Sequence, residues 1–297
     1  MPEFKDYLHL HFLVLIWGFT AILGLLITIP PVELVLYRTL FATLGLAVVL
    51  FLYRIKFRIE GHGIRTLLLT GILIAGHWLL FFGSARVSNA SVCLAGLATT
   101  SFWTSLLEPL ILKKRVKWYE VFLGLFVIVG LYIIFHFEFG HALGLAMGIM
   151  SAFLAALFTV FNARFTKMYH HYQITFYEML GAFVAILLFL PLYKFVFAES
   201  GQLRLVPTSM DFVYILILAI ICTVYAYSAS IVIMKKISAF SVNLTVNLEP
   251  VYGIALAVLI FGEKEKMHLG FYIGSSLIIL AVLAHPLLNK RYPEQVP

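Results

Sequence analysis

Ten apolar segments, each about long enough to cross a lipid bilayer, run through almost the whole chain. A membrane-spanning helix needs about 20 mostly apolar residues. Segments that meet this requirement lie at 8–27, 32–52, 67–84, 90–112, 118–135, 141–163, 173–193, 211–233, 238–261 and 267–287. Of the 297 residues, 62% are hydrophobic and 12% are charged, which is too apolar for an ordinary soluble protein. The sequence therefore predicts an all-α integral membrane protein with ten transmembrane helices.

The net charge of +7 is distributed as a membrane topology requires and does not indicate a nucleic-acid-binding surface. With the N-terminus in the cytoplasm, 15 of the 21 Lys and Arg residues lie on the inner side and 5 on the outer side. Basic residues favour cytoplasmic loops in membrane proteins. We therefore expect a multi-pass protein of the cytoplasmic (inner) membrane, with both termini cytoplasmic and no nucleic-acid partner. The first segment lacks a small-residue cleavage site, so we expect a retained span.

The second half of the chain partly repeats the first half. Residues 86–134 align with residues 236–284 without a gap, at an offset of 150. Because each half contains an odd number of spans, the two halves must have opposite orientations in the membrane. The sequence thus predicts two inverted five-helix repeats, residues 1–138 and 139–297, around a central cavity. Many small-molecule carriers use such inverted repeats to open one site to each side of the membrane in turn.

Short motifs in these spans carry a resemblance to a known superfamily. In chain order they are Trp17-Gly18, Pro30-Pro31 followed seven residues later by Arg38, Leu248-Glu249-Pro250, Phe261-Gly262-Glu263, and Gly270 with Gly274. Their order and spacing resemble the drug/metabolite transporter superfamily, in particular the ten-helix EamA-type metabolite exporters. The likeness covers essentially the whole chain.

The resemblance implies a basket of two inverted repeats in which helices 1, 3, 4, 6, 8 and 9 line a cavity and helices 5 and 10 lie at the periphery. It also implies alternating access and outward transport of amino acids or related amphipathic metabolites, without a cofactor. The first repeat departs from this pattern, because Thr100 aligns with Pro250 and Lys113 aligns with Glu263. The first repeat thus lacks the proline of a helix hinge.

Charged residues within spans are costly unless they are paired or hydrated, so they mark candidate sites. Arg38 lies about two turns inside the outer face. It either attracts a substrate carboxylate, closes an outer gate, or forms a structural pair with Glu33, and we favour the structural pair. Glu178 aligns with Arg38 at an offset of 140. We expect Glu178 to reach toward the inner surface or to pair with Arg164 or Lys167.

Glu249 differs from these because it lies midway along span 9, beside Pro250. Proline removes a backbone hydrogen bond and loosens the helix. Glu249 is a candidate proton carrier or amine ligand, with structural hydrogen bonding as an equal alternative. Ser241, Thr245 and Glu249 form one polar row on this helix, and Asn243 and Asn247 form a second. We expect one row to face the cavity and the other to face a neighbouring helix.

The remaining candidates for a substrate or ion pathway are polar and aromatic residues in other spans. They are His77, Thr100 and Thr104, together with the aromatic residues Trp17, Trp103, Tyr225 and Tyr227. His77 could titrate near neutral pH, although a neutral histidine bonded to a hydroxyl group is the commoner arrangement. Gly18 is a candidate bending point, as is Pro250. We expect Cys93 and Cys222 to be small apolar packing residues.

The motifs favour a secondary active transporter over an enzyme. The chain has no P-loop, so transport must be driven by an ion gradient such as protons, by a counter-substrate, or by the substrate gradient itself. It has no metal-ligand spacing and neither the H-E-x-x-H nor the G-x-S-x-G hydrolase motif. The alternatives are a lipid flippase, which an apolar lateral groove would favour, and an intramembrane lipid-modifying enzyme. We expect a monomer or a weak dimer.

Overall fold

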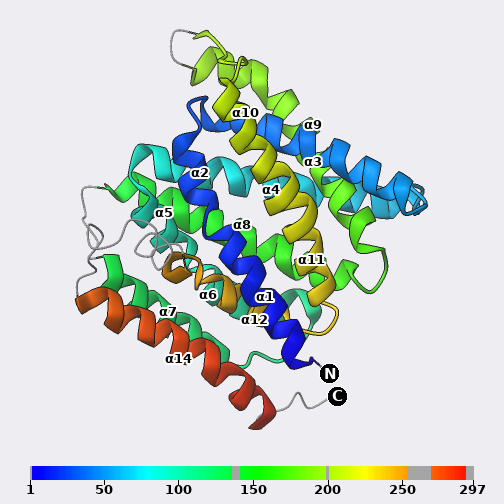
Figure 1. Ribbon diagram of the computed structural model, residues 1–297. Helices are drawn as coiled ribbons and strands as arrows, with labels where there is room; N and C mark the ends of the chain where they lie inside the picture. Colours follow the sequence, from blue (N-terminus) through cyan, green and yellow to red (C-terminus); the bar gives the residue numbers. More distant parts are fainter. Residues whose placement is uncertain (1, 136–140, 199–200, 253–268, 292–297) are drawn as a thin grey trace.

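The computed structural model describes residues 2–135, 141–198, 201–252 and 269–291, and the described chain is helical with no strand (Figure 1). Its elements are α1 (Phe4–Trp17), α2 (Thr20–Leu26), α3 (Pro31–Leu52), α4 (Gly61–Val87), α5 (Ala90–Leu97), α6 (Thr100–Leu112), α7 (Trp118–Phe135), α8 (Ala142–Phe165), α9 (His171–Val196), α10 (Ser209–Leu216), the π-helix η3 (Ile217–Tyr225), α11 (Ala226–Ile233), α12 (Ala239–Val246) and α14 (Leu269–Arg291).

Seven helical stretches of the described chain are long and apolar enough to cross a membrane. They are Phe4–Leu26, Pro31–Leu52, Gly61–Val87, Ala142–Phe165, His171–Val196, Ser209–Ile233 and Tyr272–Arg291. Each coincides with a predicted span, so the chain is a multi-pass membrane protein. The predicted segments 90–112, 118–135 and 238–261 correspond to shorter helices, and the last of them extends beyond the described residues, as does the Phe261-Gly262-Glu263 motif. The total of ten spans therefore stays a prediction.

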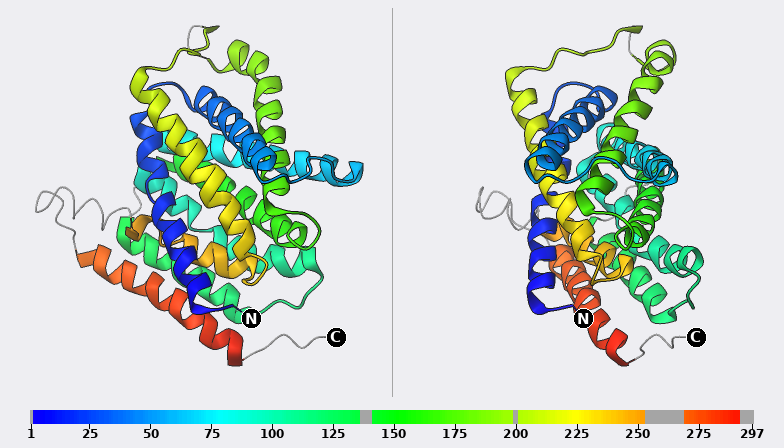
Figure 2. Two further views of the ribbon diagram at one scale, coloured as in Figure 1. Left: turned by 45° about the vertical axis from the view of Figure 1, so that its right-hand side comes forward. Right: turned by 90° about the vertical axis from the view of Figure 1, so that its right-hand side faces the viewer.

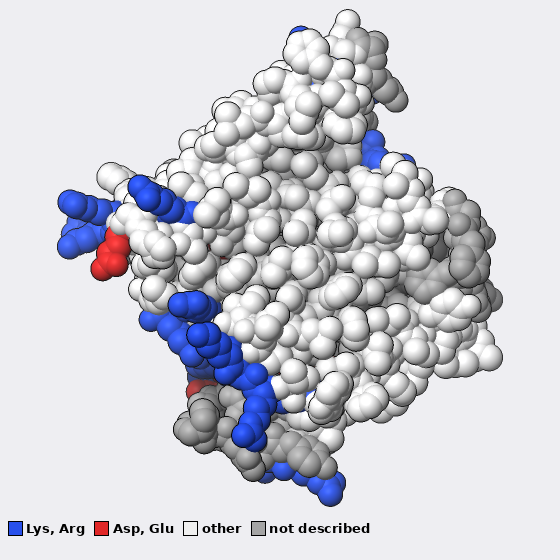
Figure 3. Space-filling view, turned by 180° about the vertical axis from the view of Figure 1, so that it is seen from behind, with Lys and Arg blue, Asp and Glu red and all other residues white. Residues whose placement is uncertain are grey.

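The outer surface of the bundle carries many large apolar side chains. Leu110, Leu188 and Phe195 are examples, with 75%, 75% and 82% of their surface exposed. Figure 3 shows a broad face almost free of charge, with most of its Lys and Arg side chains gathered along one edge. Exposed apolar area on this scale marks contact with a partner or a membrane. Because lipid tails are apolar, this surface suits the hydrocarbon core of a bilayer.

Two helices from opposite halves of the chain, α7 and α14, lie together along one edge of the bundle (Figures 1 and 2). A Cβ atom on Gly274 of α14 would clash with the carbonyl oxygen of Gly130 on α7, so both glycines are needed for this close approach. Small residues serve the same purpose in many membrane helix pairs. The position of α7 and α14 is the peripheral one expected for spans 5 and 10.

Three predicted spans are interrupted near their middle. The interruptions lie at residues 18–19 between α1 and α2, at 98–99 between α5 and α6, and at 247–248 after α12. At each one a backbone N–H bonds only three residues back: Phe19 to Ile16 at 3.4 Å, Thr99 to Gly96 at 3.2 Å, and Leu248 to Thr245 at 3.0 Å. Tighter turns of this kind inside helices often mark hinges.

At the repeat offset of 150, the interruption in span 4 lies within one residue of that in span 9, although it lacks a proline. Thr99 Oγ1 instead donates to the carbonyl oxygen of Gly96 at 2.8 Å. Thr20 Oγ1 likewise donates to the carbonyl oxygen of Trp17 at 2.8 Å. Hydroxyl groups bonded in this way compete with the helical backbone and bend it. The first repeat therefore has a helix break although it has Thr100 where the second repeat has Pro250, and hydroxyl groups account for this break.

Candidate functional site

A cavity of about 110 Å³ lies inside the bundle and is lined by residues from both halves of the chain. Its aromatic walls are Trp17, Trp78, Phe81, Phe158 and Tyr227. Its polar and charged lining residues are Thr20, Arg38, His77, Thr100, Thr159, Asn162, Ser230, Asn243 and Glu249. These residues come from predicted spans 1, 2, 3, 4, 6, 8 and 9. The six spans that the resemblance implies all line the cavity, and span 2 lines it as well, through Arg38.

The three helix interruptions all border this cavity. A lining residue stands on each side of every break: Trp17 and Thr20, Leu97 and Thr100, Val246 and Glu249. The end of a helix carries unpaired backbone groups and a partial charge, so a broken helix presents polar backbone at mid-depth. Discontinuous helices of this kind form the substrate and ion sites of many secondary transporters.

Arg38 is buried, with 3% of its surface exposed, and reaches the cavity from α3. Its Nε donates to Oγ1 of Thr223 at 3.0 Å, and its guanidinium lies 3.8 Å from the ring centroid of Trp78. No described residue accepts a hydrogen bond from its terminal nitrogens. The expected pair with Glu33 is wrong, because Glu33 accepts a hydrogen bond from the backbone N–H of Arg204 at 3.1 Å.

Glu249 lines the same cavity as Arg38 and is the first helical residue after the break in span 9. Its side chain is buried, and among the described residues it makes no hydrogen bond or ion pair. The cavity therefore holds one cationic and one acidic side chain that are not paired with each other. Each of them has polar atoms left for a ligand.

Asn243 and Asn247 tie predicted span 9 to α6 of predicted span 4, and these are the two spans that the repeat relates. Nδ2 of Asn243 donates to Oγ1 of Thr104 at 2.7 Å, and Nδ2 of Asn247 donates to Oγ of Ser101 at 2.9 Å. The asparagine row thus faces a neighbouring helix, and Asn243 also borders the cavity. Thr104 and Asn247 are not lining residues.

His77 lines the cavity and is held by α8. Its Nδ1 lies 2.8 Å from Oγ of Ser151 and 3.0 Å from the carbonyl oxygen of the same residue. This arrangement matches the commoner alternative for a membrane histidine, a ring bonded to a hydroxyl group.

Glu178 does not reach the inner surface. It is fully buried, whereas Arg164 and Lys167 are exposed. The expected pairing with either of them is therefore wrong. The hydroxyl of Tyr227 instead donates to Oε2 of Glu178 at 3.0 Å.

Two aromatic candidates lie outside the cavity lining. Trp103 packs edge-on against Phe153 at a centroid distance of 5.3 Å. Tyr225 is 45% exposed, and its hydroxyl lies 3.1 Å from Nε2 of His9. Both are aromatic residues in spans that contribute other residues to the cavity lining, so residue type alone could not separate them from lining residues.

Asn162 is a lining residue that the sequence interpretation missed. It shares one face of α8 with Thr159 and Ser151, at intervals of three and eight residues. Polar residues at such intervals in an otherwise apolar span indicate an inward face. Trp78, beside His77, had no comparable signal.

A second, more open hollow lies along α1. Its lining residues are Lys5, Leu8, His9, His11, Phe12, Leu15 and Tyr252. It shares no lining residue with the central cavity.

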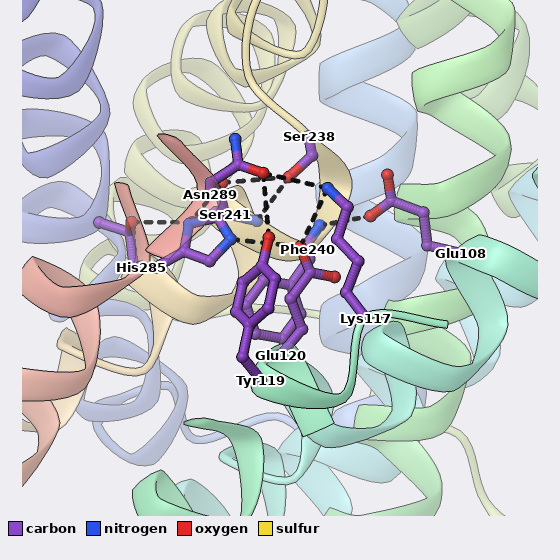
Figure 4. A network of polar contacts seen from close by, with 10 residues as sticks. Glu108, Lys117, Tyr119, Glu120, Ser238, Phe240, Ser241, His285 and Asn289 are labelled. Atoms are coloured by element: carbon purple, nitrogen blue, oxygen red, sulfur yellow. Dashed lines mark hydrogen bonds and ion pairs between the residues drawn. The ribbon is translucent and has the colours of Figure 1, made fainter. Parts of the chain in front are cut away.

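A polar network joins α6, α7, α12 and α14 at the end of the bundle where α1 begins (Figure 4). Glu108 accepts the backbone N–H of Phe240 at 2.8 Å, at the start of α12. Nε2 of His285 lies 3.3 Å from Oε1 of Glu120, and its Nδ1 lies 3.1 Å from Oγ of Ser241. This network stands apart from the cavity and fixes the peripheral helices to α12.

The fold and the cavity define a multi-pass helical membrane protein with a polar site between broken helices. The profile of the EamA-like transporter family matches residues 7–136 and again residues 142–284. The chain therefore belongs to the EamA-like transporter family, and the resemblance seen in its motifs is confirmed. It is a membrane transporter of the drug/metabolite transporter superfamily.

The fold recurs in a solved structure described as "Crystal structure of protein". The two share a TM-score of 0.77 and 14% sequence identity over 98% of this chain and 100% of the other. At this identity the likeness concerns the fold alone. No curated protein matches the chain.

Proposed function

We propose that this protein is a secondary transporter that exports a small zwitterionic metabolite, of the amino-acid class, across the cytoplasmic membrane. The observation that carries the proposal is the presence of Arg38 and Glu249 in one cavity without a bond between them. A guanidinium pairs well with a carboxylate, and a carboxylate pairs with an ammonium group. A free amino acid offers both partners at once, and the aromatic walls accommodate its side chain.

The same geometry supports alternating access between the inverted repeats as the mechanism. The helix breaks of spans 4 and 9 are related by the repeat and both border the cavity. Bending at one break and straightening at the other would open the cavity to one side and close it to the other. Export, as opposed to uptake, is the direction that the family resemblance implies.

Thermal unfolding of the purified chain with candidate ligands tests the proposal. Free amino acids should stabilise the protein in a saturable manner, by about 2.7 kcal/mol at a concentration of 100 times Kd. N-acetyl amino acids lack the ammonium group and amino-acid amides lack the carboxylate, so neither should match this effect. Counterflow of the stabilising compound in proteoliposomes then tests transport.

Variants of the two charged residues assign each ligand group to its partner. Arg38→Gln and Glu249→Gln should each weaken binding of the free amino acid by about 1.5–3 kcal/mol, the range for hydrogen bonds to charged groups. Arg65→Gln and Glu3→Gln change exposed residues of the same types and serve as controls. Equal stabilisation by free and N-acetylated amino acids would contradict the role of Glu249.

The same assay separates this proposal from a lipid flippase. The hollow along α1 is the surface that would favour a flippase, but it shares no lining residue with the cavity. Stabilisation by phospholipids in detergent, with none by any amino acid, would favour the flippase and reject the proposed transporter.

A further inference from the structure

Behind one wall of the cavity lies a second buried carboxyl group, that of Glu178 on α9. Two cavity-lining residues, Tyr227 and Asn162, stand between this group and the cavity. The Tyr227 hydroxyl donates to Oε2 of Glu178 at 3.0 Å. Nδ2 of Asn162 donates to the Tyr227 oxygen at 2.6 Å and to Oε2 of Glu178 at 3.4 Å. The three side chains form one hydrogen-bonded cluster.

Two buried oxygen atoms of this cluster have no hydrogen-bond partner among the described residues. Both hydrogen bonds to Glu178 go to Oε2, and its buried Oε1 has no hydrogen-bond partner among the described residues. The buried Oδ1 of Asn162 also lacks one. A carboxylate in such surroundings would hold an uncompensated charge at membrane depth, which is far more costly than a neutral carboxyl group. The arrangement therefore suits Glu178 in its protonated form.

No cation on the elements packed around α9 compensates the charge of Glu178. On α3, Arg38 is bonded to Thr223, and Glu33 to the backbone of Arg204. Tyr37, also on α3, donates to the carbonyl oxygen of Leu205. Each of these groups has its partner elsewhere.

The same holds for α4, α8 and α11. His62 and Arg65 on α4 are exposed, as is Arg164 on α8. His77 is bonded to Ser151, and Arg86 to carbonyl oxygens of residues 24–29. On α11, the titratable group that faces Glu178 is Tyr227 itself.

Close helix packing seals the other side of Glu178. A Cβ atom on Gly71 of α4 would clash with the backbone carbonyl of Glu178, and one on Gly181 would clash with the backbone of Leu68. Backbones this close leave no room for water between α4 and α9. Tyr227 and Asn162 both bond to the carboxyl group and line the cavity, so they mark a path from Glu178 to cavity water.

We propose that Glu178 is a proton-binding site whose occupancy controls the opening of the cavity, with Tyr227 as the gate between them. When Tyr227 moves away and cavity water reaches the carboxyl group, its O–H bond breaks. The proton passes to water, and the carboxylate keeps the electron pair. This inference rests on the proposed transport function, because it supplies the ion that drives the cycle.

The placement of Tyr227 links the Glu178 cluster to Arg38 on the substrate side. Thr223, the partner of Arg38, lies four residues before Tyr227 on the same predicted span. Four residues are about one helical turn. A ligand carboxylate that moves Arg38 would shift Thr223, and with it Tyr227 and the bond to Glu178.

Infrared spectroscopy of the purified chain tests the protonation of Glu178. At neutral pH the wild type should show the C=O band of a protonated carboxyl group that is lost in Glu178→Gln and retained in Glu249→Gln. Tyr227→Phe should shift this band because it removes the hydrogen bond, whereas Tyr225→Phe, at an exposed neighbouring tyrosine, should not. Loss of carboxylate bands in Glu178→Gln, or an unshifted band in Tyr227→Phe, would overturn the proposal.

Labelling of Cys222, a cavity-lining residue, tests the coupling to cavity opening. In a Cys93→Ser background, the rate at which a water-soluble maleimide labels Cys222 is measured. This rate is divided by the labelling rate of the unfolded chain at the same pH. This ratio should change with pH in the wild type and lose that dependence in Glu178→Gln, whereas Glu33→Gln, at a buried carboxyl group outside the cavity lining, should retain it. An unchanged pH dependence in Glu178→Gln would overturn the coupling.

These measurements use no substrate, so the two proposals can fail separately. If amino acids do not stabilise the wild type, the proposed substrate class is rejected, while the infrared and labelling results still decide the role of Glu178. If amino acids bind but Glu178→Gln retains the wild-type spectrum and labelling, the transporter proposal stands and the proton site is rejected.

Discussion

The hydroxyl group of Thr223 accepts a hydrogen bond from Nε of Arg38 at 3.0 Å, within the π-helix η3. The same hydroxyl donates to the carbonyl oxygen of Leu218, five residues earlier, at 2.8 Å. π-Helical turns are rare and occur frequently at functional sites. The unusual turn thus places a hydroxyl group where it orients the guanidinium of Arg38.

Replacing Thr223 by valine should leave the buried Nε–H of Arg38 without a partner. We expect the free energy of unfolding to fall by about 1–3 kcal/mol, the cost of an unsatisfied buried donor. Thr223→Ser keeps the hydroxyl group and should retain most of the stability. Thermal unfolding in detergent measures both variants, and a Thr223→Val variant as stable as the wild type would contradict the role of this hydrogen bond.

Replacing Gly71 by valine should force α4 and α9 apart, because a Cβ atom there would clash with the carbonyl oxygen of Glu178. Overpacking of this kind costs about 1–3 kcal/mol. Gly61→Ala is the control, since no atom lies within 4 Å of the position of its Cβ. If Gly71→Val unfolds at the wild-type temperature, the backbones of α4 and α9 do not make this close contact.

The ion pair between Lys236 and Asp6 predicts an alkaline limit to stability. Nζ of Lys236 lies 2.9 Å from Oδ1 of Asp6, and this hydrogen bond raises the pKa of Lys236 above its ordinary value of 10.5. Because the folded-state pKa is the higher one, the stabilisation is fully present below 10.5 and is lost as the pH rises through the raised pKa.

Lys236→Gln should therefore lower the unfolding temperature slightly at neutral pH and not at strongly alkaline pH. Salt should reduce the difference, because the pair is partly exposed. Lys235→Gln, at the exposed neighbouring position, controls for the loss of one positive charge. A difference that persists above the titration of Lys236 would rule out the ion pair as its cause.

Both termini should be cytoplasmic, since most Lys and Arg residues then lie on the inner side. A protease-sensitive tag on either terminus should survive external protease in intact spheroplasts and be cut after lysis. Cleavage in intact spheroplasts would reverse the proposed orientation, and with it the direction assigned to export.

The helices were predictable from the sequence because bilayer thickness sets the length of an apolar segment. Arg38, Glu249 and Trp17 were also predictable as candidates, since charged and bulky polar groups are rare at mid-depth. Whether each one faces the cavity depends on helix rotation. Trp103 and Tyr225 met the same criteria as Trp17, yet the structure places them outside the lining.

The partners of the charged residues were not predictable, because the nearest neighbours in sequence were the wrong ones. Glu33, five residues before Arg38, bonds to a loop, and Arg38 bonds to Thr223, which is 185 residues away. Glu178 likewise bonds to Tyr227 and not to Arg164 or Lys167, which are nearer in sequence. Contacts between distant spans depend on how the bundle assembles, and a single sequence carries little trace of that.

The break between α5 and α6 forms without a proline. The Thr99 hydroxyl bonds to the backbone there and favours the bend. Its mate after α12 has a proline close by and makes the same backbone turn. The break is thus encoded in backbone geometry that different side chains can produce. Under the proposed mechanism, residues that contact the substrate can diversify in evolution while the breaks are kept, which leaves one scaffold free to acquire new substrates.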